Sequence, residues 1–250
     1  MTPTPFHDHF SGHAADYRTY RPVYPPELFA YLATLPGRRE LAWDCGTGNG
    51  QAAVELVKHF ARVIATDASA EQVGQAEPHP RIEYRVCPAE ASAIPAATAD
   101  LVAVAQALHW FDFDRFYAEV RRVGRSDGVF AAISYGIHTV TPAIDAVLDR
   151  YQREFVGPFW PPERRFVDDG YGTIPFPFAE IAVPKFEMAA SWPLTAYLGY
   201  LRTWSATKRF QTAHGFDPVG RLTPEFTAAW GDAGTRPVRW ALSVRAGRIH

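Results

Sequence analysis

Residues 41–50 read Leu41-Ala-Trp-Asp-Cys-Gly-Thr-Gly-Asn-Gly50, a short apolar run that ends in an acid and continues into glycines at alternate positions. This stretch predicts a β-strand that runs directly into a nucleotide-binding turn. Gly46, Gly48 and Gly50 permit positive φ angles and let a ligand lie against bare backbone, and a helix that begins near Gly50 turns its first amides toward that ligand. A second predicted strand ends at Asp67, about 20 residues beyond the first glycine, where a carboxylate can accept both hydroxyls of a ribose.

The spacing of these glycines separates two ligand classes. A dinucleotide-binding fold requires G-x-G-x-x-G, whereas this chain has D-x-G-x-G-x-G and places Gln51 where the third glycine would stand. A lone glycine triplet also occurs in ordinary tight turns, so the rest of the chain has to decide. The acid followed by alternating glycines resembles the first motif of the class I S-adenosylmethionine-dependent methyltransferases.

Further segments extend this resemblance from about residue 10 to residue 134. The opening of the chain resembles that of a subfamily that includes the trans-aconitate methyltransferase-like proteins and the methyltransferases of type 11. The residues that carry this likeness are Phe10, Ser11, Ala14, Tyr17, Arg21, Pro22, Tyr24 and Pro25. Residues 67–69 look like the second motif of the family, residues 88–95 like its adenine-contacting turn, and residues 106–111 like its fourth motif.

Alternating strand and helix patterns predict an α/β fold. Strands are expected at 41–45, 63–66, 82–86, 101–105 and 129–134, and helices at 51–60, 70–76 and 115–123. Such alternation builds a parallel sheet with helices on both faces, and ligands bind at the carboxyl ends of its strands. The resemblance adds two C-terminal strands, which gives a Rossmann-like seven-stranded mixed sheet whose last strand is antiparallel.

Beyond Tyr135 the composition changes. Prolines and aromatic residues interleave between 142 and 178, which is too apolar for a disordered linker and too rich in proline for a regular helix. We interpret the chain as a single domain, 1–250, with a donor-binding core at 10–134, a proline- and aromatic-rich lid at 135–180, and C-terminal helices and hairpin strands at 181–250. In that last part we expect strands at 181–188 and 238–245 and helices at 193–205 and 224–230.

The composition limits the class of protein. With 250 residues, of which 47% are hydrophobic, the chain can bury a large core, and a formal net charge of -2 disfavours a nucleic-acid partner. No targeting segment opens the sequence and no run approaches the ~18 apolar residues of a membrane span, so we expect a cytoplasmic protein without a membrane partner, monomeric or homodimeric. Cys45 and Cys87 lack metal-type spacing and are interpreted as small buried hydrophobes, and no metal site is predicted.

By resemblance, the cofactor is S-adenosyl-L-methionine, and the motifs assign its contacts. The backbone carbonyls of Gly46 and Gln106 would hold the ammonium group of this donor, Asp44 would brace the loop, and Asp67 would hold the ribose. Asp44 as a helix N-cap or turn residue, and Asp67 as a turn residue, stay open as structural alternatives. The full set of predicted donor contacts is Tyr17, Arg21, Asp44, Gly46, Thr47, Gly48, Asp67, Ala68, Ala89, Glu90 and Gln106.

The adenine and the carboxylate of the donor are assigned in the same way. Ala68 would cover the face of the adenine, and Ala89 and Glu90 its edge. Tyr17 and Arg21 would cap the carboxylate, because the planar fork of an arginine suits that group. Glu90 as a solvated turn residue, and Tyr17 and Arg21 as packing residues, are the alternatives.

The methyl acceptor is expected after the fourth strand, beside His109 and Trp110. His109 would act as a base for a hydroxyl acceptor, since a reference pKa of about 6.5 suits proton removal near neutral pH; the alternative, which we favour, is a histidine that only shapes the pocket wall. Tyr200 and Trp204 lie four residues apart on a predicted helix and would close the pocket together with Trp110. Nearby cations would suit a carboxylate acceptor, namely Arg202, Lys208 and Arg209.

These observations predict an S-adenosylmethionine-dependent methyltransferase that acts on a small organic molecule, at oxygen and with a carboxylate among the candidates. Transfer from a sulfonium requires orientation and exclusion of water, so the absence of a catalytic dyad is expected. Two alternatives remain. One is an S-adenosylmethionine-binding sensor or scaffold without transfer activity, and the other is an NAD-dependent dehydrogenase, which the missing third glycine disfavours.

Overall fold

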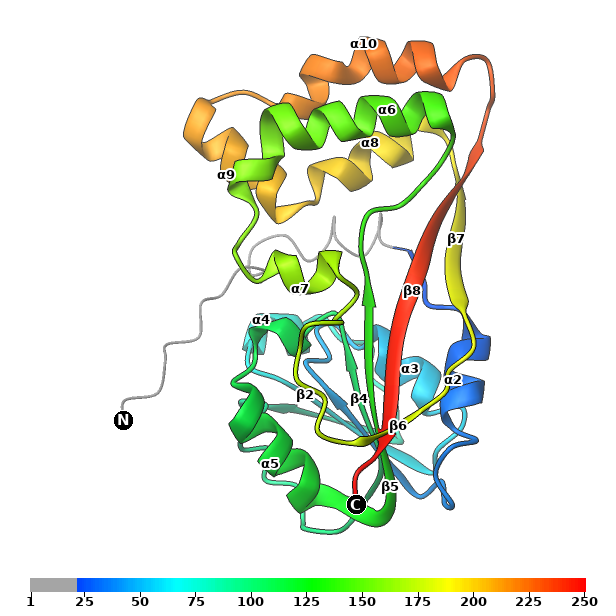
Figure 1. The fold of residues 1–250 in the computed structure, drawn as a ribbon, viewed down its shortest axis with the longest axis vertical. Coiled ribbons are helices and arrows are strands. Elements are labelled where there is room, and N and C mark those ends of the chain that lie inside the picture. Colours follow the sequence, from blue (N-terminus) through cyan, green and yellow to red (C-terminus); the bar gives the residue numbers. More distant parts are fainter. Residues whose placement is uncertain (1–21) are drawn as a thin grey trace.

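The computed structural model describes residues 22–250, and a large mixed sheet forms its centre (Figure 1). The strands run in the order β3-β2-β1-β4-β5-β8-β6, and β7 also pairs with β8. The first five strands are mutually parallel: β1 (Leu41–Cys45), β2 (Arg62–Asp67), β3 (Ile82–Val86), β4 (Ala99–Ala105) and β5 (Gly124–Tyr135). The predicted α/β fold is confirmed, and β1 and β3 have the predicted bounds.

Successive residues of each strand enter two separate hydrophobic cores. Ala42 and Val63 share a core with α2 (Pro26–Leu32) and α3 (Gln51–Leu56), whereas their neighbours Trp43 and Ile64 share a core with α5 (Phe113–Val123). This alternation follows from the pleat, which points successive side chains to opposite faces. A strand buried on both faces is mainly apolar, which explains why 41–45 and 99–105 are apolar except for one buried acid in each, Asp44 and Asp100.

Four helices gather beyond the carboxyl ends of the parallel strands and form what we call the helical cap (Figure 1). They are α6 (Pro142–Tyr151), α8 (Leu194–Arg202), α9 (Ser205–His214) and α10 (Pro218–Trp230). The antiparallel strand β8 (Arg236–Arg248) pairs with β5 along its C-terminal half and with β7 (Phe186–Trp192) along its N-terminal half. β8 therefore joins the sheet to the cap, and the antiparallel C-terminal strand is confirmed.

Within residues 22–250 the sheet has eight strands rather than seven, because the strand expected at 181–188 is divided. β6 (Ala179–Ile181) and β7 both pair with β8. Pro184 lies between them, and a residue without an N–H cannot continue a ladder of hydrogen bonds. The single long strand is thus replaced by two short ones on the same partner.

The segment expected as an irregular lid contains regular helix. α6 begins at Pro142 and continues into a π-helical turn, η2 (Gln152–Val156). Pro142 stands in the first turn, where its missing N–H has no intrahelical partner to lose, and the next proline is Pro158. The expectation that proline prevents helix here is therefore wrong for 142–156. Only the stretch after it is limited to short pieces, η3 (Gly157–Phe159) and α7 (Arg164–Asp168).

The C-terminal helices also differ from expectation. α10 begins at Pro218 rather than Pro224, because the Asp217 side chain accepts a hydrogen bond from the N–H of Val219 and caps the helix there. α9 was not predicted as a separate helix. No helix among residues 22–250 combines the length and the apolarity that a bilayer crossing needs.

Candidate functional site

The glycine loop after β1 has the backbone conformation that its sequence predicts. Gly46, Gly48 and Gly50 have φ angles of +70°, +56° and +88°. A Cβ at Gly46 would clash with the Cβ of Ala107, whereas the nearest atom to a Cβ at Gly48 is Oε1 of Gln72, at 3.8 Å. Gly46 is therefore required by a close approach of the next loop, and Gly48 borders open space in which a ligand can contact the backbone.

Asp44 is a buried acid at the end of β1. Its Oδ2 accepts a hydrogen bond from the hydroxyl of Thr47, and its Oδ1 has no hydrogen-bond partner in the part of the chain that the structure describes. Burial raises the pKa of the Asp44 carboxyl to about 7, against the lowering effects of Thr47 and of the Ala53 backbone. A cation beside Oδ1 would favour the ionised carboxylate. Because the helix after the loop has Gly50 as its N-cap, the interpretation of Asp44 as a helix cap is wrong.

Asp67, at the end of β2, ties two loops together. Its Oδ2 accepts a hydrogen bond from the N–H of Gly48 at 2.8 Å, and its Oδ1 accepts one from the N–H of Ser69 at 2.9 Å. Ser69 in turn caps α4 (Ala70–Gly74). The turn-residue alternative thus describes part of what Asp67 does. A carboxylate oxygen has two lone pairs, so the same group can also accept hydroxyl protons from a ligand.

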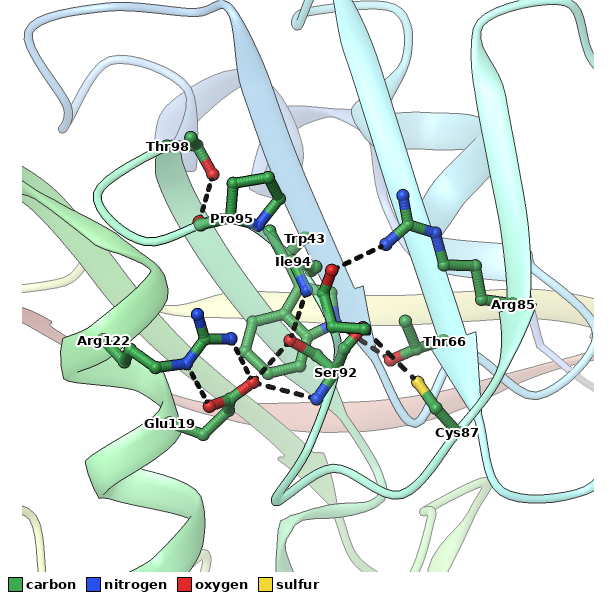
Figure 2. Close-up of polar contacts among 11 residues, drawn as sticks. Trp43, Thr66, Arg85, Cys87, Ser92, Ile94, Pro95, Thr98, Glu119 and Arg122 are labelled. Carbon is green, nitrogen blue, oxygen red and sulfur yellow. Dashed lines mark hydrogen bonds and ion pairs between the residues drawn. The ribbon is translucent and has the colours of Figure 1, made fainter.

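A hydrogen-bonded network supports the turn after β3, which carries Ala89 and Glu90. The buried Glu119 of α5 accepts hydrogen bonds from the N–H and the hydroxyl of Ser92, at 2.8 and 2.6 Å, and from Arg122 at 2.7 Å (Figure 2). Burial alone would raise the pKa of the Glu119 carboxyl, but the hydrogen bonds from Arg122 and Ser92 lower it to about 2. The Glu119 carboxylate, in its ionised form, therefore fixes this turn.

The three residues predicted to contact adenine follow neighbouring strands. Ala68 lies just after β2 and is half-buried, and Ala89 is buried in the turn after β3. Glu90 is half-buried, and its Oε1 accepts a hydrogen bond from the N–H of Asp112 at 3.0 Å. Glu90 therefore connects the turn after β3 to the start of α5. Since β2 and β3 are parallel neighbours, all three residues lie at the same edge of the sheet.

The end of β4 has a strained backbone at Gln106. Its φ is +57°, a conformation that costs a residue other than glycine about 1–3 kcal/mol. Two hydrogen bonds to β5 hold it there: its N–H donates to the carbonyl of Ile133 at 2.9 Å, and its Nε2 donates to the carbonyl of Tyr135 at 2.8 Å. The next residue, Ala107, is the one that crowds Gly46, so this turn borders the glycine loop.

His109 lies in a short 3₁₀ turn, η1 (Leu108–Trp110), and is buried. Its Nδ1 is hydrogen-bonded to the hydroxyl of Tyr171 at 2.8 Å, and its ring centroid is 4.7 Å from that of Trp110. Burial lowers the pKa of His109 to about 3, and the charge of Arg164 acts in the same direction. His109 is therefore neutral near pH 7 and a weaker base than its reference pKa implies. Its role as a base stays a prediction.

The predicted acceptor residues Tyr200 and Trp204 meet in the cap, with ring centroids 5.7 Å apart. The indole of Trp240 donates a hydrogen bond to the Tyr200 hydroxyl at 3.2 Å. These rings surround His138, which sequence reasoning missed. His138 is 1% exposed, its Nε2 is hydrogen-bonded to the hydroxyl of Tyr197 at 3.0 Å, and its Nδ1 has no hydrogen-bond partner within residues 22–250. Burial lowers the pKa of His138 to about 3.

Other predicted residues lie elsewhere. Arg202 pairs with Asp217 at 2.8 Å, and Arg209 donates to a backbone carbonyl at 3.4 Å, so both cations are engaged within the cap. Tyr17 and Arg21 lie outside the described residues. Cys45 is buried and Cys87 is half-buried. Between residues 22 and 250, no three metal-ligating side chains lie together.

The glycine loop offers a set of groups that fits S-adenosylmethionine. Two buried polar atoms without hydrogen-bond partners border it, Oδ1 of Asp44 and the hydroxyl of Tyr84, whose ring faces Gly50. The first suits a cation and the second can donate or accept a hydrogen bond. The backbone of Gly48 is not crowded by neighbouring side chains, and Asp67 presents a carboxylate at the next strand end.

Comparisons with known proteins agree with this arrangement. A family model described as a methyltransferase domain matches residues 43–132. A protein of Dictyostelium discoideum that is named a methyltransferase is 36% identical over 233 residues, which cover 92% of this chain and 89% of that protein. An S-adenosylmethionine-dependent methyltransferase of Saccharomyces cerevisiae is 32% identical over 47% of this chain and 44% of its own length.

A solved structure supports the same conclusion over nearly the whole chain. It is described as a type II methyltransferase from Anaeromyxobacter dehalogenans and is 46% identical to this chain. The similarity covers 92% of this chain and 98% of that one, with a TM-score of 0.87. The likeness thus includes the cap as well as the sheet.

Proposed function

Because the chain belongs to the class I S-adenosylmethionine-dependent methyltransferases, we propose that it transfers a methyl group from S-adenosyl-L-methionine to an oxygen of a small organic molecule. The observation that carries the donor assignment is the glycine loop, where the N–H of Gly48 donates to Asp67 and, among residues 22–250, Oδ1 of the buried Asp44 has no hydrogen-bond partner. The acceptor assignment rests on aromatic residues at the end of β4 and in the cap, where Trp110 contacts His109 and Tyr200 contacts Trp204. A net charge of -2 supports a small molecule over a nucleic acid.

We infer the following roles for the donor-binding residues. Asp44 and the carbonyls of Gly46 and Gln106 hold the ammonium group, and Asp67 accepts the ribose hydroxyls. Ala68, just after β2, borders the adenine together with Ala89 and Glu90, which lie on the turn that Glu119 fixes through Ser92. The strained backbone of Gln106 supports this proposal, since strain of this kind concentrates at functional sites.

The chemistry of the bound donor makes few demands on the chain. S-adenosylmethionine supplies a methyl group on a sulfonium, so a lone pair of the acceptor oxygen forms the new O–C bond while the electrons of the S–C bond return to sulfur as a neutral thioether. The chain aligns the two molecules and excludes water. His109 and Tyr171, joined by a hydrogen bond at the end of β4, form a buried wall suited to that second task.

A hydroxyl acceptor has to lose its proton, and His109 at the end of β4 is not a strong enough base to remove it. Burial lowers the pKa of His109 and of His138 to about 3, so neither histidine suits proton removal near pH 7. We propose that the acceptor is acidic enough to reach the site ionised, as a carboxylate or an acidic hydroxyl. Arg202, one of the cations expected to suit a carboxylate acceptor, is paired with Asp217, so it gives a carboxylate acceptor less support.

The donor assignment is tested by Asp67→Ala. We expect the affinity for S-adenosylmethionine to fall by about 1.5–3 kcal/mol, the range for hydrogen bonds to a charged group, with the fold retained. Titration calorimetry measures the affinity and circular dichroism the fold, and Asp232→Ala, at an exposed residue in the turn between α10 and β8, is the matched control. Unchanged affinity in Asp67→Ala would remove this carboxylate from the site.

Two further measurements separate the alternatives. Donor labelled in its methyl group, incubated with the protein and a fractionated metabolite extract, identifies the acceptor, and tight donor binding with no labelled fraction would favour a sensor or scaffold. In a thermal-shift assay only a ligand of the native state raises the melting temperature, so a shift with NAD and none with S-adenosylmethionine would favour a dehydrogenase. A cytoplasmic location and a monomeric or homodimeric state stay predictions.

A further inference from the structure

His138 lies at the same edge of the sheet as the proposed donor site. It follows the last residue of β5, Tyr135, by three positions. The Tyr135 carbonyl accepts a hydrogen bond from the side chain of Gln106, at the end of β4. The histidine therefore stands where the chain leaves the sheet for the cap, one strand away from the turn that borders the glycine loop.

Aromatic rings enclose His138. The ring centroids of Tyr197, Tyr200, Trp240 and Trp204 lie 5.2, 5.4, 5.5 and 6.0 Å from its own. A buried polar atom without a partner costs about 1–3 kcal/mol, so a histidine among such rings is expensive unless something bonds to it. A phenylalanine would fill this place without that cost.

The hydrogen bond to Tyr197 indicates which nitrogen carries the proton. Among the described residues, the Tyr197 hydroxyl has Nε2 of His138 as its hydrogen-bond partner, at 3.0 Å. The phenolic proton is satisfied only if Nε2 accepts it, and a neutral imidazole that accepts at Nε2 carries its hydrogen on Nδ1. Nδ1 is thus a hydrogen-bond donor, and it has no acceptor. The missing partner is an oxygen or another acceptor atom.

A second donor without a partner lies nearby. Nε1 of Trp160 is buried and unbonded, and its ring centroid is 5.5 Å from that of Trp204, which also contacts His138. The guanidinium of Arg164 lies 4.3 Å above the Trp160 ring and acts electrostatically on His109. His138 and Trp160 thus both contact Trp204, and Arg164, which covers the Trp160 ring, is paired with Asp168 at 2.6 Å. A flat molecule beside Trp204 would meet two N–H donors and aromatic faces.

We propose that His138, Trp160 and Trp204 form an acceptor subsite that recognises a flat, conjugated molecule in which the hydroxyl to be methylated is conjugated to a carbonyl. The carbonyl oxygen accepts the hydrogen bond from Nδ1 of His138, and the rings stack on the flat face. The hydroxyl of such a compound loses its proton to water readily, because the negative charge spreads onto the carbonyl oxygen. Donation from Nδ1 to that oxygen stabilises the anion further, which replaces a base. This inference rests on the proposed methyl transfer and specifies its acceptor.

A pair of isosteric probes tests the subsite. We use 4-hydroxybenzaldehyde and 4-vinylphenol, which differ in a carbonyl oxygen against a methylene group, in the presence of S-adenosylhomocysteine. We expect the wild-type protein to bind the aldehyde about tenfold or more tightly than the vinyl compound, since a site built for a hydrogen bond rejects an analogue that lacks it. The phenolate absorption of the bound aldehyde should also exceed that of the free aldehyde at the same pH.

Variants assign both effects to His138. His138→Phe should lose the preference for the aldehyde and the gain in phenolate absorption, while His138→Gln, which keeps an N–H donor, should retain part of both. Tyr197→Phe should weaken the preference, because it releases the constraint on the tautomer. Binding of S-adenosylhomocysteine, measured in every variant, should match the wild type.

The possible results distinguish this inference from the proposed function. If S-adenosylhomocysteine binds but the wild type does not prefer the aldehyde, or if His138→Phe keeps the preference, the subsite is wrong and the unbonded Nδ1 is an internal cost of the fold. If neither probe binds while S-adenosylhomocysteine does, the subsite is also wrong. If S-adenosylhomocysteine does not bind, the proposed methyl transfer itself fails.

Discussion

The loops of the donor-binding core and the interior of the helical cap are fixed by different kinds of contact. In these loops, at the ends of the strands, carboxylates accept hydrogen bonds from groups of neighbouring turns: Asp67 accepts from two amides, and Glu119 from an amide and a hydroxyl. In the cap, aromatic rings fill the space between helices. Tyr197 of α8 lies 5.6 Å from Phe226 and 5.4 Å from Trp230 of α10, between ring centroids.

This difference has a consequence for recognition. A hydrogen bond constrains both distance and direction, so the core presents fixed groups at fixed places, which suits one invariant donor. Packing of apolar side chains constrains mainly volume and tolerates exchanges of similar size. The cap can therefore adapt to different acceptors while the core remains the same, and the two regions should respond separately to mutation.

The largest expected effect comes from emptying the cap. Phe226→Ala removes a fully buried ring from α10, and such truncations cost about 3–5 kcal/mol. Urea denaturation should show that loss, while calorimetry at 25 °C should give a donor affinity within about twofold of the wild type if the regions are separate. Phe216→Ala, at a ring that is 43% exposed, is the control and should cost little. Loss of donor binding in folded Phe226→Ala would show that the core depends on the cap.

The second prediction concerns backbone rather than packing. Gly46→Ala places a Cβ against Ala107 and forces a positive φ on alanine, and the strain and the overpacking together should cost about 3 kcal/mol. Donor affinity should fall with stability, because the loop itself is distorted. Gly215→Ala has the same backbone strain, with a φ of +75°, but no atom within 4 Å of the new methyl group. Equal losses in the two variants would mean that the crowding at Gly46 has no effect.

The core was predictable because its signals are local. Asp44 to Gly50 lie within seven residues, and the strand, the turn and the helix are each encoded where they occur. The network of Ser92 and Glu119 was missed because its partners are 27 residues apart and no local pattern indicates that they bond to each other. The strand and turn patterns therefore located the donor site without revealing the side chains that fix its adenine turn.

The cap was predicted poorly for the same physical reason. His138 has no local signal, since its significance depends on rings from α8 and β8, 59 to 102 residues further along the chain, from Tyr197 to Trp240. Helical spacing correctly brought Tyr200 and Trp204 together, although α8 ends at Arg202 and Trp204 is the N-cap of the next helix, α9. Proline content misled the prediction of α6, because the position of a proline in a helix matters more than its number.

The third prediction is a pH dependence of donor binding in the core. The pKa of Asp44 is raised from 3.8 to about 7, so its ionisation destabilises the free protein as the pH rises between these values. If the ionised Asp44 pairs with the donor's cation, affinity should rise about tenfold per pH unit below pH 7 and level off above it. Calorimetry from pH 5.5 to 8 measures this, and Asp44→Asn should bind more weakly and without the slope. A flat wild-type profile would exclude Asp44 as the counter-ion.

The smallest expected effect compares the two buried histidines, one in each region. Burial lowers the pKa of His109 and of His138 from 6.5 to about 3. A histidine held neutral in the folded state contributes stability that is fully present above the unfolded pKa and is lost as the pH falls from 6.5 toward 3. Each histidine should therefore lower the free energy of unfolding by about 1.4 kcal/mol for each pH unit that the pH falls in that window.

Asp44 changes the unfolding free energy in the opposite direction, so each histidine variant has to be compared with the wild type. The difference in unfolding free energy between pH 7 and 5.5, measured in urea, should shrink by about 1 kcal/mol in His109→Gln and by a similar amount in His138→Gln. If His109→Gln keeps the wild-type dependence of unfolding free energy on pH, this histidine is charged or hydrated in the folded core and becomes a candidate base again. If the two variants lose the same amount of pH dependence, core and cap exclude water equally well despite their different contacts.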